Sequence, residues 1–291
     1  MIISIASGKG GTGKTTVAVS LALSIDNVQF LDCDVEEPNA HLFLKPRISR
    51  TEKACLLMPV VDETKCRLCG KCRDVCEYNA IAVLPASQTK NSHVLIFQNL
   101  CHGCGACSLL CPSNAIKEVD REIGVIEIGE KNDMEFIHGR LNIGEAMSPP
   151  VIRQVKKHIS MTKSVIIDAP PGTSCPVISA VKGTDFCILV TEPTPFGLND
   201  LILTVELLRK MNVQFGVIIN RSDLGNDEVE MYCIKENIHV LMHIPFKKEI
   251  AAACSQGIPL VKAFPEYENS FRQLFIQIKE LMKGNNHGKK S

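Results

Sequence analysis

The sequence lacks three features that would direct it to a membrane, an export pathway or a polyanion. Its 32 Lys and Arg residues are balanced by 32 Asp and Glu residues, whereas a dedicated binder of nucleic acid or acidic membrane carries a basic excess. No apolar run reaches the roughly 18 residues of a membrane span. Residues 1–6 have no basic segment ahead of an apolar one, as a signal peptide would. We therefore expect a cytoplasmic protein with no membrane span and no nucleic-acid partner.

Cysteine, by contrast, is abundant, with 14 among 291 residues. Disulfides are rare in the cytoplasm, so thiols in this number indicate metal binding. Eight of them form two runs with the spacing C-x2-C-x2-C-x3-C, and the second run begins 35 residues after the first. The runs consist of Cys66, Cys69, Cys72 and Cys76, and of Cys101, Cys104, Cys107 and Cys111.

In such a pair of runs, three thiolates wrap one [4Fe–4S] cube and the fourth ligates the other cube. The rule predicts one site with Cys66, Cys69, Cys72 and Cys111, and a second with Cys101, Cys104, Cys107 and Cys76. The alternative is two structural zinc sites, although these usually combine separated C-x2-C pairs. His102 is either a solvent-facing loop residue or a group whose charge tunes a cluster. Residues 60–122 resemble bacterial-type two-cluster ferredoxins, with Glu77 where the second run has a proline.

A phosphate-binding loop follows the first expected strand. Residues 8–15 read G-x4-G-K-T between a strand at 1–6 and an apolar helical segment at 17–25, which is the context that this motif requires. Backbone amides and the helix N-terminus would hold phosphates, while a glycine-rich turn without a ligand is the alternative. Lys14 would neutralise the β- and γ-phosphates, Thr15 would hold Mg2+ and Thr16 would lie beside the α-phosphate. The loop residues are Gly8, Lys9, Gly10, Gly11, Thr12, Gly13, Lys14, Thr15 and Thr16.

Acidic residues follow two other expected strands. Asp34 comes after the strand at 28–32, and Asp168 ends the strand at 163–168. The carboxyl ends of strands beside a phosphate loop are where Mg2+ and an attacking water are held. A lone Asp there is more often a turn former or helix cap, but the two together with the loop indicate function. Asp32 is a weaker candidate for metal binding.

Lys9 adds a second lysine inside the loop, and with it the sequence resembles the MinD/ParA ATPases and the nitrogenase iron protein. The resemblance implies an ATP-dependent dimer in which Lys9 reaches the partner's nucleotide, rather than a solvated lysine. It also implies that Asp34 positions the water, that Asp168 holds Mg2+ through water and that Gly172 senses the γ-phosphate. Asn220 stands where the family recognises adenine; otherwise it caps a strand end.

The cysteine runs interrupt the nucleotide-binding pattern, because the loop and Asp34 precede them and Asp168 follows. The arrangement resembles MinD-superfamily ATPases with an inserted ferredoxin domain. We expect an α/β fold: a mainly parallel P-loop NTPase sheet flanked by helices, with a small inserted α+β ferredoxin domain. The expected domains are 1–57 and 123–291 for the ATPase and 58–122 for the insert. Further strands are expected at 186–191, 214–219 and 239–244, a hairpin at 123–141, and a helix from Ser148.

Other features have plainer interpretations. Cys175 lies seven residues after Asp168, a spacing that resembles a cluster ligand of the iron protein, but residues 120–167 hold no second cysteine. We expect a buried thiol there instead. Apolar residues at helical spacing in 271–282 predict a core helix rather than an amphipathic membrane anchor. The remaining thiols are expected to be core or incidental: Cys33, Cys55, Cys187, Cys233 and Cys254.

The sequence thus predicts a slow, Mg2+-dependent ATPase that binds ATP, ADP and two [4Fe–4S] clusters. It would form an ATP-dependent homodimer or a heterodimer with a related ATPase. In the favoured function, ATP gates electron transfer to a redox partner. In the second, the protein assembles or delivers an iron–sulfur or mixed-metal cofactor to an apo-metalloprotein. In the third, it is a MinD/ParA-type spatial organiser with structural or sensory clusters. Two complete cysteine motifs favour the first two, and the lack of an obvious labile site favours the first.

Overall fold

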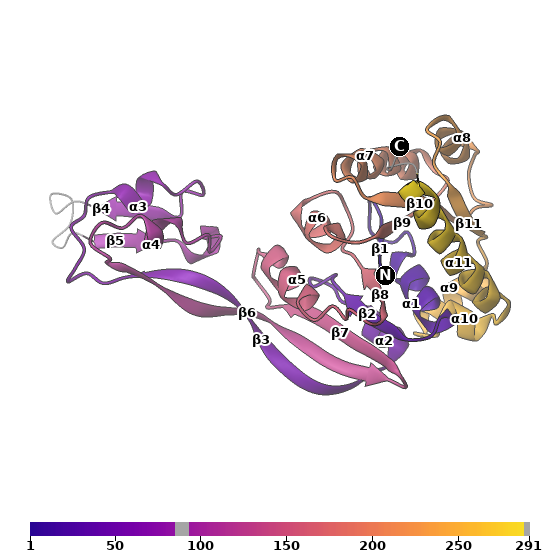
Figure 1. The fold of residues 1–291 in the computed structure, drawn as a ribbon, viewed down its shortest axis with the longest axis horizontal. Helices are drawn as coiled ribbons and strands as arrows, with labels where there is room; N and C mark the ends of the chain where they lie inside the picture. Colours follow the sequence, from indigo (N-terminus) through magenta and orange to yellow (C-terminus); the bar gives the residue numbers. More distant parts are fainter. Residues whose placement is uncertain (85–92, 288–291) are drawn as a thin grey trace. The chain divides into compact units, whose positions relative to one another are not determined.

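The computed structural model describes residues 1–84 and 93–287, and the chain divides into two compact units. Unit 1 comprises Met1–Glu52, Ile126–Arg140 and Ile152–Ser291, and unit 2 comprises Lys53–Val125 and Leu141–Val151 (Figure 1). The segment predicted as the insert, residues 58–122, lies within unit 2. The unit is wider than that segment because it includes residues on both sides.

A nine-stranded sheet has the order β11-β10-β9-β1-β8-β2-β7-β6-β3. Every neighbouring pair from β11 to β7 is parallel, which confirms the predicted α/β class. The six strands predicted for this sheet are all present. In sheet order the bounds are β11 (Val240–Ile244), β10 (Gln214–Asn220), β9 (Phe186–Thr191), β1 (Ile2–Ala6), β8 (Ser164–Asp168), β2 (Val28–Asp32), β7 (Met134–Leu141), β6 (Ile116–Lys131) and β3 (Arg47–Val61).

The central strands are almost wholly apolar because helices cover both faces of a parallel sheet. Every residue of β2 and β9 is buried. The helices are α1 (Lys14–Ser24), α2 (Ala40–Leu44), α5 (Ser148–Lys156), α6 (Cys175–Val181), α7 (Pro195–Lys210), α8 (Glu228–Lys235), α9 (Lys248–Ser255), α10 (Leu260–Ala263) and α11 (Glu266–His287). Figure 1 shows α1, α9, α10 and α11 on one side of the strands and α6 and α7 on the other.

Strands β3 and β6 are longer than the sequence indicates. The hairpin predicted at 123–141 is present as β6 and β7, but β6 begins already at Ile116. β3 was not predicted, because its first residues are mostly polar and exposed and do not alternate as strand residues do. β3 and β6 approach closely at Gly129, where a Cβ would lie 2.4 Å from the carbonyl oxygen of Arg47.

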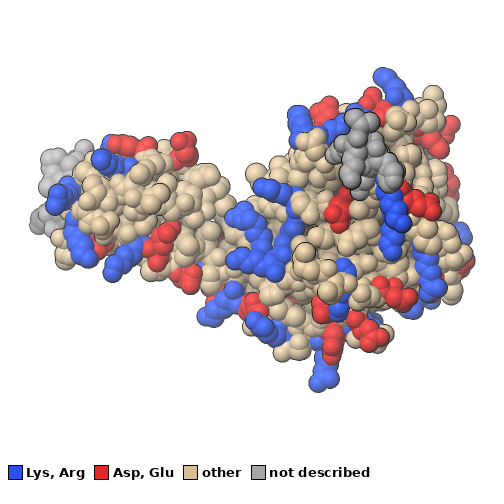
Figure 2. Space-filling view, viewed as in Figure 1, with Lys and Arg blue, Asp and Glu red and all other residues tan. Residues whose placement is uncertain are grey.

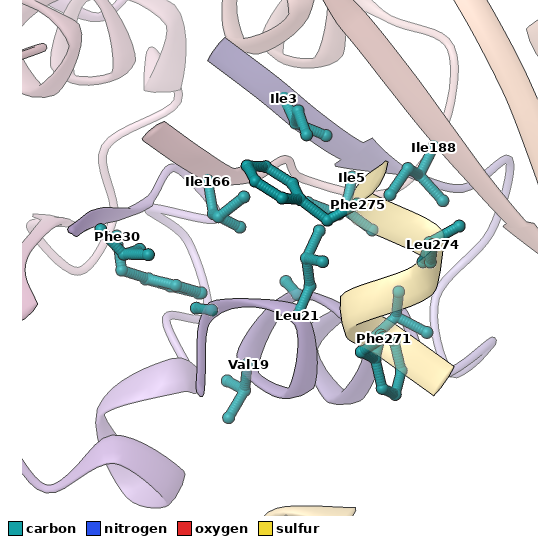
Figure 3. Close-up of a cluster of buried hydrophobic side chains, with 14 of the residues drawn as sticks. Ile3, Ile5, Val19, Leu21, Phe30, Ile166, Ile188, Phe271, Leu274 and Phe275 are labelled. Atoms are coloured by element: carbon teal, nitrogen blue, oxygen red, sulfur yellow. The ribbon is translucent and has the colours of Figure 1, made fainter. Parts of the chain in front are cut away.

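Helix α11 belongs to the core. Phe271, Leu274 and Phe275 are buried with Leu21 of α1 and Ile5 of β1 (Figure 3). This confirms the prediction of a core helix. Among the helices of the described residues, none is both long and apolar enough to span a membrane.

Unit 2 contains both cysteine runs and is small and mixed α+β. β4 (Ile81–Leu84) pairs antiparallel with β5 (His93–Ile96). The sequence repeat is also a backbone repeat, because Gly70 and Gly105 both adopt left-handed conformations, with φ of 79° and 75°, before a short helix. These helices are α3 (Lys71–Asp74) and α4 (Ala106–Leu109), and a 3-10 turn, η1 (Gln98–Leu100), precedes the second run.

Candidate nucleotide site and cysteine sites

Lys14 is the centre of a buried charge cluster at the carboxyl end of the sheet. Its Nζ lies 2.9 Å from Asp168 Oδ1 and 3.5 Å from Asp34 Oδ2. Burial alone would lower the pKa of Lys14, but the two carboxylates outweigh burial and raise this pKa above its ordinary value. For Asp34, burial outweighs the attraction of Lys14 and raises the pKa to about 6. The three residues that the sequence proposed from separate segments therefore meet at one point.

Asp32 and Asp168 have different roles in this cluster. Asp32 accepts hydrogen bonds from the amides of Asp34 (3.1 Å) and Ala40 (3.0 Å), so it fixes the segment that carries Asp34. Burial raises the pKa of Asp32 to about 8. In Asp168, by contrast, Oδ2 is buried and has no hydrogen-bond partner among the described residues. A free carboxylate oxygen is the kind of ligand that Mg2+ or its bound water prefers, so the donor set fits this ion.

A cavity of about 640 Å3 opens beside the phosphate loop, within the range of small-molecule and cofactor pockets. Its apolar wall includes Leu42, Phe43 and Ile250, which suits a nucleotide base. The predicted site residues that line it are Gly10, Gly11, Gly13, Lys14, Thr15, Thr16, Asp34 and Asn220. Five others, Gly8, Lys9, Thr12, Asp168 and Gly172, do not line this cavity.

Asn220 connects the cavity with the loop. Its Nδ2 donates to the Thr12 carbonyl oxygen at 2.8 Å. Gly13 has a φ of 91°, and a Cβ there would lie 2.4 Å from this same Nδ2, so the contact requires glycine. The Gly172 amide donates to the carbonyl oxygen of Ser7, the residue before the loop, at 2.9 Å. This hydrogen bond links the segment after β8 to the start of the loop. Recognition of adenine by Asn220 stays a prediction.

Glu192 is a site residue that the sequence analysis missed. Its carboxylate is nearly buried between Lys9 Nζ, at 3.4 Å, and Arg221 Nη1, at 2.7 Å. It lies just beyond β9, so the rule that selected Asp34 and Asp168, an acid at a strand end beside the loop, would have found it.

One expectation about cysteines needs correction. Cys175, the first residue of α6, is exposed rather than buried. Cys254 is half-buried and lines the cavity, with its Sγ 3.8 Å from Thr16 Oγ1. Buried positions are confirmed for Cys33, Cys187 and Cys233, and Cys55 is half-buried.

The eight motif cysteines divide into two sets in unit 2. One small cavity is lined by Cys66, Cys69, Cys72 and Cys111, and another by Cys76, Cys101, Cys104 and Cys107. We call these site 1 and site 2. They are the same sets that the spacing predicts for two clusters.

Each set has the number of thiols that a [4Fe–4S] cube takes. Each site offers four thiols, and amides already point at the sulfurs: Ala115 N lies 3.2 Å from Cys111 Sγ and Ala80 N 3.3 Å from Cys76 Sγ. Within residues 1–84 and 93–287, no three His, Cys, Asp or Glu side chains are grouped to hold one metal ion. A zinc ion needs sulfurs within about 2.3 Å of one point, whereas in a [4Fe–4S] cube each thiolate binds a different iron.

Comparison with known proteins identifies the nucleotide-binding part. Residues 3–260 match the model of the CobQ/CobB/MinD/ParA nucleotide-binding domain family. The chain belongs to this family. It is 33% identical over 287 residues to the uncharacterized protein MJ0578 of Methanocaldococcus jannaschii, covering 97% of this chain and 98% of that protein. It is 26% identical to an iron–sulfur cluster carrier protein of Rickettsia conorii, covering 89% of this chain and 65% of the carrier.

Solved structures of the family share the fold. The septum site-determining protein MinD of Pyrococcus horikoshii, solved with Mg-ADP, superposes with a TM-score of 0.58 at 21% identity, covering 96% of each chain. The cell division ATPase MinD of Pyrococcus furiosus gives the same TM-score at 22% identity, covering 96% of this chain and 98% of that one. At these identities the likeness establishes the α/β P-loop fold.

Proposed function

We propose that this protein is a slow, Mg2+-dependent ATPase in which a nucleotide-driven dimer switch controls a two-[4Fe–4S] module for electron transfer to a redox partner. One observation carries the proposal: eight cysteines form two separate four-thiol sites in a chain whose other unit holds a complete phosphate loop with its acidic partners. Bound clusters would supply one-electron chemistry at low potential. Nucleotide binding and hydrolysis are carried out by side chains of this chain.

Binding of MgATP must break the ion pairs that the loop lysines make in the structure. Lys14 exchanges Asp168 and Asp34 for phosphate oxygens, and Asp34 then accepts a proton from the attacking water. The free oxygen of Asp168 and the Thr15 hydroxyl would hold Mg2+, which would neutralise charge on the phosphates when bound. Lys9 leaves Glu192 for the nucleotide of a second copy.

The chain offers a direct route from this site to the cysteines. Asp32 holds both the amide of Asp34 and that of Ala40, the first residue of α2. After α2, only two residues precede β3, whose far end lies five residues before Cys66. A movement of Asp34 therefore acts on a segment that continues as a strand into unit 2, which is how nucleotide state would reach the cluster sites.

The proposal is tested by anaerobic reconstitution of the full chain with iron and sulfide. We expect about eight irons and eight sulfides per chain, an EPR signal on reduction, and Mg2+-dependent ATP hydrolysis. The matched pair of variants Cys69→Ser and Cys233→Ser separates site thiols from core thiols. Cys69→Ser should lose iron and Cys233→Ser should not. One or two zinc ions in place of the clusters would refute the cluster part of the proposal.

A second candidate is cluster assembly or delivery, because several relatives are named iron–sulfur cluster carrier proteins. The two candidates differ in what the protein gives up: a delivery factor releases a cluster, and an electron carrier releases an electron. A delivery factor passes whole clusters to an apo-ferredoxin on addition of MgATP and loses its own iron in step. An electron carrier reduces the acceptor and keeps all of its iron. Measuring iron on both proteins after separation decides between the two.

A further inference from the structure

The two cysteine sites have the same backbone but different surroundings. Asn79 and Asn114 occupy equivalent positions and both have positive φ, 51° and 49°. Equivalent amides, those of Ala80 and Ala115, donate to the sulfurs of Cys76 and Cys111. These backbone features match, whereas the side chains around the two sites do not.

The ligand loops differ in charge. Residues 66–76, which carry three ligands of site 1, include Arg67, Lys71 and Arg73 against a single acid, Asp74. Residues 101–111, which carry three ligands of site 2, include no Lys, Arg, Asp or Glu. Figure 2 shows charges of both signs on the visible face of each unit, so the contrast is local to the loops.

Two of the basic side chains at site 1 are not neutralised. Arg73 pairs with Asp74 through two contacts, at 3.0 and 2.8 Å. Arg67 and Lys71 are exposed and have no ion pair among the described residues, and both line the cavity of site 1. They therefore place positive charge beside that cavity.

Equivalent glycines face different charges. At Gly70, beside site 1, a Cβ would lie 3.4 Å from Arg73 Nη2 and 3.9 Å from Asp74 Oδ2, two residues that form an ion pair. At Gly105, beside site 2, it would lie 3.1 Å from Glu118 Oε1. Glu77 adds a second acid next to Cys76, a ligand of site 2, where the other run has the uncharged Pro112.

The side chains near the fourth ligand of each site, Cys111 at site 1 and Cys76 at site 2, differ as well. The Ser113 hydroxyl lies 3.7 Å from Cys111 Sγ, in hydrogen-bonding reach of a site 1 sulfur. At the equivalent position near site 2, Tyr78 stacks flat on His102, with ring centroids 3.5 Å apart. Both rings line the cavity of site 2, so they cover it with aromatic surface instead of offering a hydroxyl to a thiolate.

We infer that the two sites are unequal in reduction potential, and that Arg67 and Lys71 make site 1 the place where the electron rests. Positive charge and hydrogen-bond donors stabilise the reduced, more negative cluster, and carboxylates destabilise it. An electron given to site 2 by a one-electron donor then passes to site 1; site 2 is oxidised by one electron as site 1 is reduced, with no bond or proton transferred. The cationic loop at site 1 also fits an acidic surface on the acceptor protein. The inference rests on the proposed function.

The test is an EPR-monitored redox titration of the reconstituted full chain at low ionic strength, without nucleotide. We expect two distinct midpoint potentials. Arg67→Gln with Lys71→Gln should lower the higher potential and leave the lower one in place. Glu118→Gln should raise the lower potential. Lys210→Gln with Lys262→Gln removes two exposed lysines of unit 1 and should change neither value.

Salt provides a second readout, because exposed charges are screened within about 10 Å at 0.1 M ionic strength. The gap between the two potentials should narrow as salt is added to the natural protein and should change less in the Arg67, Lys71 variant. Equal potentials in the natural protein, or an Arg67, Lys71 variant that shifts the lower potential, would overturn the inference while leaving two clusters in place. Absence of two clusters by iron and sulfide analysis would instead overturn the proposed function itself.

Discussion

Replacing Lys14 tests whether the buried charge cluster is a nucleotide site. The Lys14 side chain is 7% exposed and that of Asp168 is 1% exposed, so Lys14→Met leaves a buried carboxylate without its cation. Losing one partner of a buried ion pair costs about 3–5 kcal/mol. We therefore expect the free energy of unfolding at pH 8 to fall by about this amount. We also expect MgATP binding to be lost, because the lysine that neutralises the β- and γ-phosphates is gone.

The loss of stability should depend on pH. Asp34, with its pKa raised to about 6, is largely ionised at pH 8 and protonated at pH 5, where its need for Lys14 is smaller. A carboxyl whose pKa is raised by folding stabilises the fold at low pH and loses that contribution as pH rises through the folded value. The difference in free energy of unfolding between the variant and the natural protein should thus be smaller at pH 5 than at pH 8. Urea denaturation followed by circular dichroism measures both differences.

Lys156→Met is the matched control. Lys156 Nζ donates to three backbone carbonyls, those of Ser179, Ala180 and Lys182, and does not line the nucleotide cavity. Its replacement should destabilise the protein. Under conditions in which the variant is fully folded, MgATP binding should be unchanged. If Lys14→Met binds a fluorescent ATP analogue as tightly as Lys156→Met does, the assignment of the site is wrong.

Three further predictions concern single residues. Asp34→Asn should abolish ATP hydrolysis but not ATP binding, and the natural enzyme's rate should fall as pH drops through about 6; a flat profile from pH 5 to 8 in steady-state assays would exclude Asp34 as the base. Gly13→Ala, which strains a left-handed residue by about 1–2 kcal/mol and displaces Asn220, should weaken ATP binding roughly fivefold to thirtyfold by calorimetry. Phe271→Ala should lower the free energy of unfolding by about 3–5 kcal/mol; a change under about 1 kcal/mol in urea denaturation would remove α11 from the core.

The sequence was most informative where local chemistry fixes local structure. The phosphate loop needs its glycines for left-handed turns, as at Gly13. The motif therefore predicts the strand before it and the helix after it. The two cysteine runs repeat in backbone as they do in sequence. Buried parallel strands such as β9 are apolar throughout and could be read from composition.

Features set by distant parts of the chain could not be predicted in this way. β3 is a strand because β6 pairs with it, whereas its own first residues are mostly polar and exposed. Cys254 lies in α9, far from the phosphate loop in sequence, and only the fold brings it to the cavity beside that loop. The acidic environment of Gly105 depends on Glu118, which follows the second run and has no motif of its own.

Under the proposed function, nucleotide state at unit 1 controls the cluster sites of unit 2. The most direct test is the midpoint potential of the reconstituted full chain, titrated with MgATP, with MgADP and without nucleotide. We expect at least one potential to shift between the MgATP and nucleotide-free states, and Lys14→Met to abolish the shift. Potentials that are identical in all three conditions, in a protein shown to have bound MgATP, would contradict it.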